Sequence, residues 1–205
     1  MDVLTTLGRT LGFSFAAGLN LYATVAVLGL ASRYGWVDLP PQYRVFDNNI
    51  VIIAALVMYA IEFIADKVPW VDTVWDGIHT AIRPLGGALI AVTTLGDASP
   101  TMQGLVALLG GAVAASTHVT KAGTRAVVNA SPEPFSNWLL SLGEDAFVLG
   151  LGFLALHYPR VTLVVCLVLL GVIALFFVTI VRSARRWWTS KPPQHPPQPR
   201  ISAPS

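Results

Sequence analysis

The chain has 205 residues, of which 54% are hydrophobic and 12% are charged. In an average soluble domain roughly a quarter of the residues are charged, so this composition excludes an ordinary soluble globule. Residues 161–181 contain no charged side chain, and about 20 apolar residues suffice for a helix to cross a hydrocarbon core of roughly 30 Å. We therefore expect an all-α, polytopic membrane helix bundle.

The apolar segments follow one another in chain order. They predict about six spans, at residues 10–31, 49–65, 78–95, 103–120, 135–156 and 161–181. The first segment runs apolar through Leu30 after a start that has only Arg9 as a basic residue, which is not the pattern of a removable signal peptide. We expect it to remain in the mature protein.

The third and fourth spans are the irregular ones. Pro84 and the Gly86-Gly87 pair interrupt the third, and the fourth ends in a polar run that includes His118 and Lys121. Either is a candidate for a broken or re-entrant helix, which a membrane tolerates only where it is buried in protein or lines a wet cavity.

A weak internal repeat suggests two halves, 10–96 and 103–182. The matching small residues lie at a constant offset: Gly12, Ala16 and Ala17 against Gly110, Ala114 and Ala115. Two halves of three spans each would have opposite orientations, as in the inverted repeats of many secondary transporters.

Basic residues follow the last span and indicate the topology. They are Arg182, Arg185, Arg186, Lys191 and Arg200. The positive-inside rule places this tail in the cytoplasm, and an even number of spans then places the N-terminus there too. We expect a membrane domain at 1–188 and a disordered, proline-rich cytoplasmic tail at 189–205.

Charged residues at helical spacing on or beside the spans are the functional candidates, because a charge in a membrane is costly. Glu62 and Asp66 lie four apart, a like-charge spacing that needs a proton, a cation or a basic side chain between them. The adjacent Lys67 is one candidate partner. The alternative is that Asp66 and Lys67 form a solvated helix end.

A second stripe lies on the face of a predicted amphipathic helix that Pro84 ends. Its members are Asp72, Asp76, His79 and Arg83, at spacings of four, three and four. Asp76 and His79 would pair within the helix. A solvated surface helix is the alternative, and it fits Asp72 better than Arg83.

A third stripe is basic and contains His118, Lys121, Arg125 and Asn129. Several donors on one face are suited to a phosphate or a carboxylate group. The alternative is a cytoplasmic loop that obeys the positive-inside rule. Carboxylates in or beside the spans need basic partners, and this stripe can provide them, which favours ion pairing over a solvated loop. These carboxylates are Glu62, Asp66, Asp76, Glu144 and Asp145.

Glu144 and Asp145 interrupt the fifth span halfway. Two adjacent carboxylates inside a span indicate function more strongly than any other feature of the sequence. We expect Glu62 to lie within salt-bridge reach of Lys121 or Arg125.

No catalytic or metal-binding motif is found in the sequence. The single cysteine, Cys166, lies in an apolar span, and the histidines lack ligand spacing. We expect no metal, no cofactor and no enzyme activity, with a membrane enzyme acting on lipid head groups left open.

Several ordered motifs between Leu11 and Pro159 resemble the bacterial domain-of-unknown-function family 4126. They are Gly18-Leu19-Asn20-Leu21-Tyr22, Glu62-Phe63-Ile64-Ala65-Asp66-Lys67-Val68-Pro69, Arg83-Pro84, Thr120-Lys121-Ala122-Gly123-Thr124-Arg125 and Ser131-Pro132-Glu133-Pro134-Phe135-Ser136-Asn137. The resemblance implies a multi-span inner-membrane protein and implies no activity.

These observations lead to one functional hypothesis and one alternative. We expect a small transporter or channel-like protein for an anionic or lipid-phosphate solute, with proton coupling. The solute would contact Lys121, Arg125, Arg83, His118 and Asn20, and the proton or ion-pair residues would be Glu62, Asp66, Lys67, Asp76, His79, Glu144 and Asp145. The alternative is a non-transporting scaffold or lipid-binding protein with structural ion pairs. Expected partners are membrane lipids and a small solute, with no nucleic acid and with a homo-oligomer left open.

Overall fold

The computed structural model describes residues 2–130 and 134–189 and forms two compact units, Met1–Ile173 and Ala174–Ser205. The described residues are helical, as expected. The helices are α1 (Val3–Leu19), α2 (Leu21–Tyr34), the 3₁₀ helix η1 (Pro41–Phe46), α3 (Asn49–Ala65), α4 (Pro69–Leu95), α5 (Pro100–Asn129), α6 (Pro134–His157) and α7 (Pro159–Thr189). The expected proline-rich tail at 189–205 lies outside the described residues apart from Thr189.

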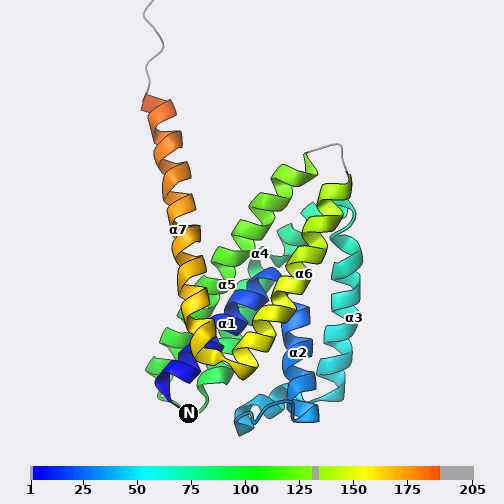
Figure 1. Ribbon diagram of the computed structural model, residues 1–205, viewed down its shortest axis with the longest axis vertical. Helices are drawn as coiled ribbons and strands as arrows, with labels where there is room; N and C mark the ends of the chain where they lie inside the picture. The colour runs from blue at the N-terminus through cyan, green and yellow to red at the C-terminus, as the bar shows by residue number, and fades with distance from the viewer. Residues whose placement is uncertain (1, 131–133, 190–205) are drawn as a thin grey trace, which may run out of the picture. The chain divides into compact units, whose positions relative to one another are not determined.

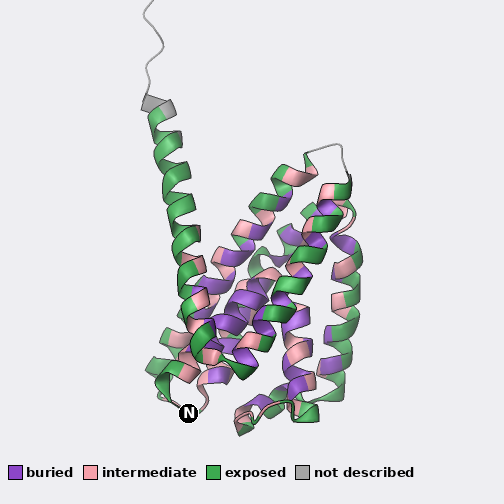
Figure 2. Ribbon diagram, in the orientation of Figure 1, coloured by how far each residue is buried: buried purple, intermediate pink, exposed green. Residues whose placement is uncertain are grey.

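Four of the described helices are long and apolar enough to cross a membrane. They span Pro69–Leu95, Pro100–Asn129, Phe135–His157 and Pro159–Ser183, and α3 is a shorter apolar helix of 17 residues. In the first unit, the buried parts of the helices carry charged side chains such as Glu62 and Arg83 beside an apolar core, and exposed stretches run along the outside (Figure 2). Many large apolar side chains, such as Leu89 and Phe153, are exposed there. Exposed apolar side chains along the helices suit a lipid environment.

The first expected span is not one helix. Asn20 separates α1 from α2 with an extended backbone (φ −147°), and its side-chain oxygen accepts the N–H of Ala23 at 2.9 Å as the N-cap of α2. Asparagine is among the best N-cap residues. The expectation of a single helix over 10–31 is therefore wrong.

The two short helices form a hairpin inside the first unit. Successive turns of α5 contact successive turns of α1, because Thr117 binds the carbonyl of Phe15 and Lys121 binds that of Leu19. The end of α2 approaches the start of α3, where a Cβ at Gly29 would meet Ile52. The chain thus enters along α1, turns at Asn20 and returns along α2 (Figure 1).

The third and fourth spans are continuous helices rather than broken ones. Pro84 lies inside α4 and does not end it, so the amphipathic stripe and the third span belong to one helix that starts at Pro69. Helix α5 likewise continues through the polar run to Asn129. Helix α6 is uninterrupted at Glu144 and Asp145, because an exposed or paired side chain does not disturb backbone hydrogen bonds.

The small residues on which the proposed repeat rests lie at close contacts between helices. Gly110 of α5 faces α4 so closely that a Cβ there would meet Ala91, the carbonyl of Gly87 and Ser14. The repeat itself is not confirmed, because its best-matching segments lie in α1 and α5, which run in the same direction in the first unit, whereas inverted halves would run oppositely.

The second unit contains the last described turns of α7. Its apolar side chains are exposed, for example Leu175 at 69% and Phe176 at 57%.

We predict that Gly110→Leu destabilises the protein, because the side chain must enter a filled contact. Overpacking of this kind costs about 1–3 kcal/mol, which should lower the melting temperature in detergent by several degrees. Gly104→Leu on the same helix is the matched control, since a Cβ at Gly104 meets nothing within 4 Å. Equal melting temperatures of the two variants would contradict the close contact.

Candidate functional site

The helices of the first unit enclose a buried group of charged side chains, which we call the charged cluster. Spacings of three and four along α3, α4 and α5 turn these side chains to one face of each helix. The cluster consists of Glu62, Asp66, Asp72, Asp76, Arg83, Lys121, Arg125, Glu144 and Asp145.

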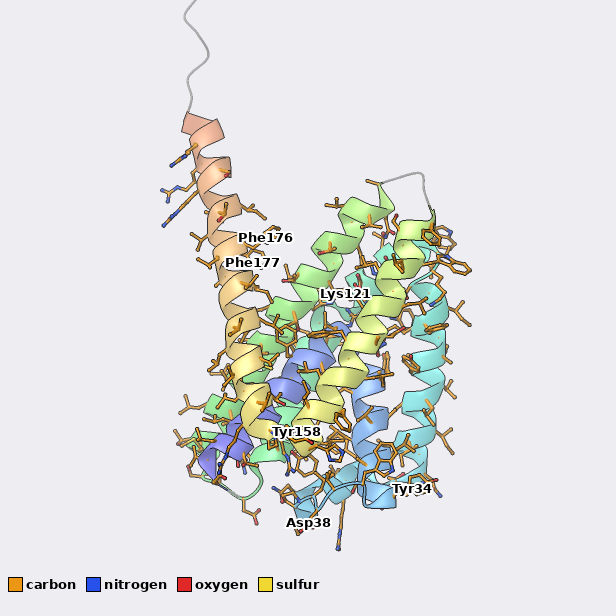
Figure 3. The ribbon with its side chains drawn as sticks, in the orientation of Figure 1. Tyr34, Asp38, Lys121, Tyr158, Phe176 and Phe177 are labelled. Atoms are coloured by element: carbon orange, nitrogen blue, oxygen red, sulfur yellow. The ribbon has the colours of Figure 1, made fainter. Side chains whose placement is uncertain are left out.

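Lys121 joins the helix hairpin to α3 and α6. Its amine lies 3.0 Å from Asp66 Oδ2, 3.5 Å from Glu62 Oε1 and 3.6 Å from Glu144 Oε2. It also donates to the carbonyl of Leu19, at the end of α1, at 3.2 Å. Figure 3 shows Lys121 far from the end of the unit that carries Tyr34, Asp38 and Tyr158. Lys121 is only 3% exposed, so the cation lies in the interior of the bundle.

Arg125, one turn further along α5, binds α6 and the end of α3. Its guanidinium donates to Glu144 Oε2 at 2.6 Å, to Asp66 Oδ2 at 3.1 Å and to the backbone carbonyl of Asp66 at 2.9 Å. Asn137 accepts from the same guanidinium at 2.8 Å and donates to the Asp66 carbonyl at 3.0 Å. A planar group with five donors is suited to such a junction.

Arg83 determines the protonation of a neighbouring histidine. Its NH2 donates to Glu62 Oε1 at 2.6 Å, and its NH1 donates to Nδ1 of His118 at 2.8 Å. Because arginine has no acceptor, this Nδ1 carries no proton. His118 is then neutral, with its proton on Nε2, where Thr80 Oγ lies at 3.2 Å.

Two further carboxylates are bound by amide side chains. Asp72 Oδ2 accepts from Asn129 at 2.7 Å, and Arg125 is 3.9 Å away. Asp145 Oδ1 accepts from the side chain of Asn20, at the tip of the hairpin, at 3.2 Å. Among the described residues, Asp145 has no ion pair within 4 Å.

His79 lies beside the cluster and contacts the hairpin. Its Nδ1 donates to the carbonyl of Trp75 at 2.8 Å, and its Nε2 is hydrogen-bonded to the hydroxyl of Tyr22 at 2.9 Å. The expected pair of Asp76 with His79 is not among the described contacts, where Asp76 instead pairs with Arg83 at 3.1 Å.

Carboxylates outnumber cations in the cluster. Six acidic side chains face three basic ones; counting the partly buried Lys67 raises the basic total to four, and a protonated His79 would raise it to five. Several buried carboxylate oxygens have no hydrogen-bond partner: Glu62 Oε2, Asp66 Oδ1, Asp72 Oδ1, Asp145 Oδ2 and both oxygens of Asp76. Buried charge of one sign is unfavourable, so the cluster is suited to binding protons.

The chain matches the model of a known family. The family model described as Domain of unknown function (DUF4126) matches residues 7–179. The chain belongs to this family. No curated protein and no solved structure matches the chain. The DUF4126 assignment confirms the resemblance seen in the sequence motifs, and it carries no named activity.

The DUF4126 motifs contribute most of the cluster. The structure brings together the expected residues Asn20, Arg83, His118, Lys121 and Arg125 with all the expected carboxylates. Glu62 lies within reach of Lys121 at 3.5 Å, as expected, and Arg83 is closer at 2.6 Å. Residues 131–133 of the last quoted motif lie outside the described residues.

Lys67 does not bridge Glu62 and Asp66 in the structure, where Lys121 occupies that place. The Lys67 amine donates to the Phe63 carbonyl at 2.9 Å and to Ser141 Oγ at 3.4 Å. It also lies 3.1 Å from the centre of the Phe63 ring. Asp66 is buried, which argues against a solvated helix end.

Sequence reasoning missed three polar residues of the site. Tyr22 and Asn137 occur in the quoted family motifs, and their place there was the available signal; Ser141 follows Asn137 by four residues on one helix face. Among the described residues, no group of three or more histidine, cysteine, aspartate or glutamate side chains is placed to hold a metal ion.

We predict that Lys121→Met lowers the free energy of unfolding by about 3–5 kcal/mol, because it removes one of the two cations that Asp66 and Glu62 each contact and so enlarges the excess of buried carboxylates. Thermal unfolding in detergent measures the loss. Arg33→Gln is the control: the Arg33–Asp47 pair at 2.8 Å is partly exposed, and exposed pairs contribute at most about 1 kcal/mol.

A second variant separates pairing from packing. Adding Asp66→Asn to Lys121→Met removes one of the carboxylates that lost this cation, so the double variant should be more stable than the single one. A double variant that is less stable than the single one would contradict this expectation and would show that the pair of Asp66 with Arg125 outweighs the excess of buried charge.

Proposed function

We propose that this protein is a proton-translocating membrane transporter, in which the carboxylates of the charged cluster bind and release protons. The observation that carries the proposal is the excess of buried carboxylates over cations. A transporter needs a site that is stable in two charge states, and a cluster with partnerless oxygens has places for added protons. Buried carboxylates within spans are typical of proton relays.

The broken first span supports the same function. Helix ends and an extended residue inside a membrane are tolerated where they are buried in protein or line a cavity, and transporters use such discontinuous helices at their binding sites. Here the break at Asn20 contacts the cluster directly, through Asp145 and Lys121.

The charge balance favours a proton over an anion as the bound species. Arg83, Lys121 and Arg125 each contact a carboxylate, so an anionic solute would have to displace one. The anionic or lipid-phosphate solute expected from the sequence stays a prediction, to be tested with a panel of such solutes in the same vesicles.

We predict that Asp145→Asn reduces proton uptake at least tenfold in proteoliposomes that contain a pH-sensitive dye and carry an imposed membrane potential. Asp145 is the carboxylate without a described ion pair, and asparagine keeps its shape and its acceptor for Asn20. Asp97→Asn, at an exposed position outside the cluster, is the control and should transport normally. Wild-type protein that moves sodium or potassium but no protons would refute the proposal.

A paired variant distinguishes transport from the scaffold alternative. Arg125→Gln with Glu144→Gln removes both members of a buried ion pair, while Asp66 keeps Lys121 and Asp72 keeps Asn129 as partners. Under the scaffold hypothesis the double variant folds and is almost as stable as the wild-type protein. Under the transport hypothesis it folds but loses uptake.

We propose further that the basic tail is cytoplasmic and that the N-terminus lies on the other side of an inner membrane. The sequence led us to expect both termini in the cytoplasm, on the basis of six spans. The α1–α2 hairpin instead returns the chain to the side on which it began, and one crossing each by α3 to α7 gives an odd number.

We predict that a reporter fused after Arg186 scores as cytoplasmic, while an N-terminal epitope tag is accessible from outside in spheroplasts. A tag that becomes accessible only after the membrane is permeabilised would place both termini inside and would contradict the hairpin.

A further inference from the structure

A groove of about 540 Å³ lies between α5 and α6 of the first unit and reaches the end of α1 at Leu19. Val128 of α5 and Leu140 and Phe147 of α6 contribute apolar walls. Sites for small molecules have volumes of roughly 300–1,000 Å³ and mostly apolar walls with a few polar groups. The size and the walls of this groove therefore suit a drug-sized apolar molecule.

Glu144 connects the groove to the charged cluster. It is the one charged side chain among the described residues that line the groove. Its side chain is 13% exposed, against 0% for Glu62 and 2% for Asp66. Phe147 follows Glu144 by three residues and therefore lies on the same face of α6. A ligand in the groove can thus contact a carboxylate and an aromatic ring together.

The charges around the groove favour a positively charged ligand. Glu144 pairs with Arg125 at 2.6 Å and lies 3.6 Å from Lys121, but both cations also contact Asp66. The charged cluster as a whole has six carboxylates and three cations, so an added cation reduces the excess charge and an added anion increases it. The hydroxyl of Thr124, another lining residue, donates to a carbonyl of its own helix at 2.9 Å, which leaves its oxygen as an acceptor.

An organic cation fits these walls better than a metal ion does. Hard metal cations take six or more oxygen ligands, and the apolar side chains of the groove do not supply them. The face of an aromatic ring attracts cations, and quaternary ammonium groups are recognised in this way. Phe147, which is 38% exposed, can supply such a face beside the carboxylate of Glu144.

The depth of Glu144 in its helix excludes the head group of a phospholipid as the cation. Glu144 follows Pro134, the first residue of α6, by ten positions, which corresponds to about 15 Å along the helix axis. In a hydrocarbon core of roughly 30 Å, the carboxylate lies near the middle of the membrane. A phospholipid could place only its hydrocarbon chain there. The fitting ligand therefore carries its positive charge on an apolar body.

We infer that this groove binds hydrophobic organic cations, such as quaternary ammonium or phosphonium ions with aryl or alkyl groups. Glu144 and Phe147 contact the positive charge, and the apolar walls contact the body of the ligand. Binding of this kind does not require the movement of protons. The inference therefore goes beyond the proposed function, and it is tested without a proton gradient.

Two ions of the same shape and opposite charge test the inference directly. Tetraphenylphosphonium and tetraphenylborate are titrated into the purified full-length protein in a nonionic detergent, with protein-free detergent as the blank, and calorimetry measures binding. We expect saturable binding of tetraphenylphosphonium, at least tenfold tighter than that of tetraphenylborate. Equal binding of the two ions would overturn the inference, because the groove would then accept any apolar body. No saturable binding of tetraphenylphosphonium would overturn it as well.

A pair of glycine variants locates the bound ion. A Cβ at Gly143, in the lining of the groove, meets nothing within 4 Å, so the side chain of Gly143→Leu fills the groove without displacing a neighbour. Gly150→Leu on the same helix is the matched control, because its position is equally open and lies outside the lining. We expect at least tenfold weaker binding of tetraphenylphosphonium in Gly143→Leu and unchanged binding in Gly150→Leu. Unchanged binding in Gly143→Leu would overturn the assignment to this groove.

Glu144→Gln tests the carboxylate, since it keeps the shape of the side chain and removes its charge. We expect at least tenfold weaker binding of tetraphenylphosphonium, unchanged binding of tetraphenylborate, and recovery of phosphonium binding in Glu144→Asp. Full phosphonium binding in Glu144→Gln would overturn the role of Glu144. Melting temperatures show whether each variant is folded, and if Glu144→Gln is not, the two glycine variants and the two ions still decide.

Discussion

Burial of charge is the constraint on which the first unit depends. A charged side chain in the low-dielectric interior is tolerated only when oppositely charged or hydrogen-bonding groups surround it. Lys121 satisfies this requirement with ligands from three other elements: the carbonyl of Leu19, the carboxylate of Asp66 and the more distant Glu144. The positions of α1, α3 and α6 around α5 are therefore held by electrostatics as well as by packing.

The hairpin of α1 and α2 is stable for the same reason. Two helix ends inside a membrane expose backbone groups that no water satisfies. Asn20 caps the N–H groups of α2, and Lys121 binds the last carbonyl of α1. The side chain of Asn20 also binds Asp145. The break in the first span and the charged cluster are thus two parts of one arrangement.

Spacing along the sequence predicted much of this site, and the reason is physical. Charges repeated at three and four residues must share one helix face, and carboxylates in apolar segments must meet cations, so the pairing of Glu62 with Lys121 could be predicted from spacing and charge. The same argument failed for Lys67, because adjacency in sequence says nothing about which way a helix end turns. It failed for Asp76 and His79 because Arg83 is a stronger partner than a neutral ring.

Local breaks in helices were harder to predict than charges. Pro84 and the glycine pair at Gly86 suggested a broken helix, yet α4 runs through them, because packing against α5 outweighs local propensity. The real break is at Asn20, where an N-capping side chain follows Leu19 in an apolar run. That signal was present, but apolar periodicity continues on both sides of it and conceals the reversal of the chain.

The tip of the hairpin gives the proposed function a structural consequence. Asp145 holds Asn20 through a hydrogen bond to a carboxylate oxygen, and such a bond is stronger when the acceptor is ionised. Protonation of Asp145 under the proposed function therefore weakens the hold of α6 on the hairpin, while Lys121 continues to bind Leu19 one residue earlier. Under the proposed function, the proton occupancy of Asp145 would therefore alter one of the two contacts that fix the tip of the hairpin and leave the contact with Lys121 in place.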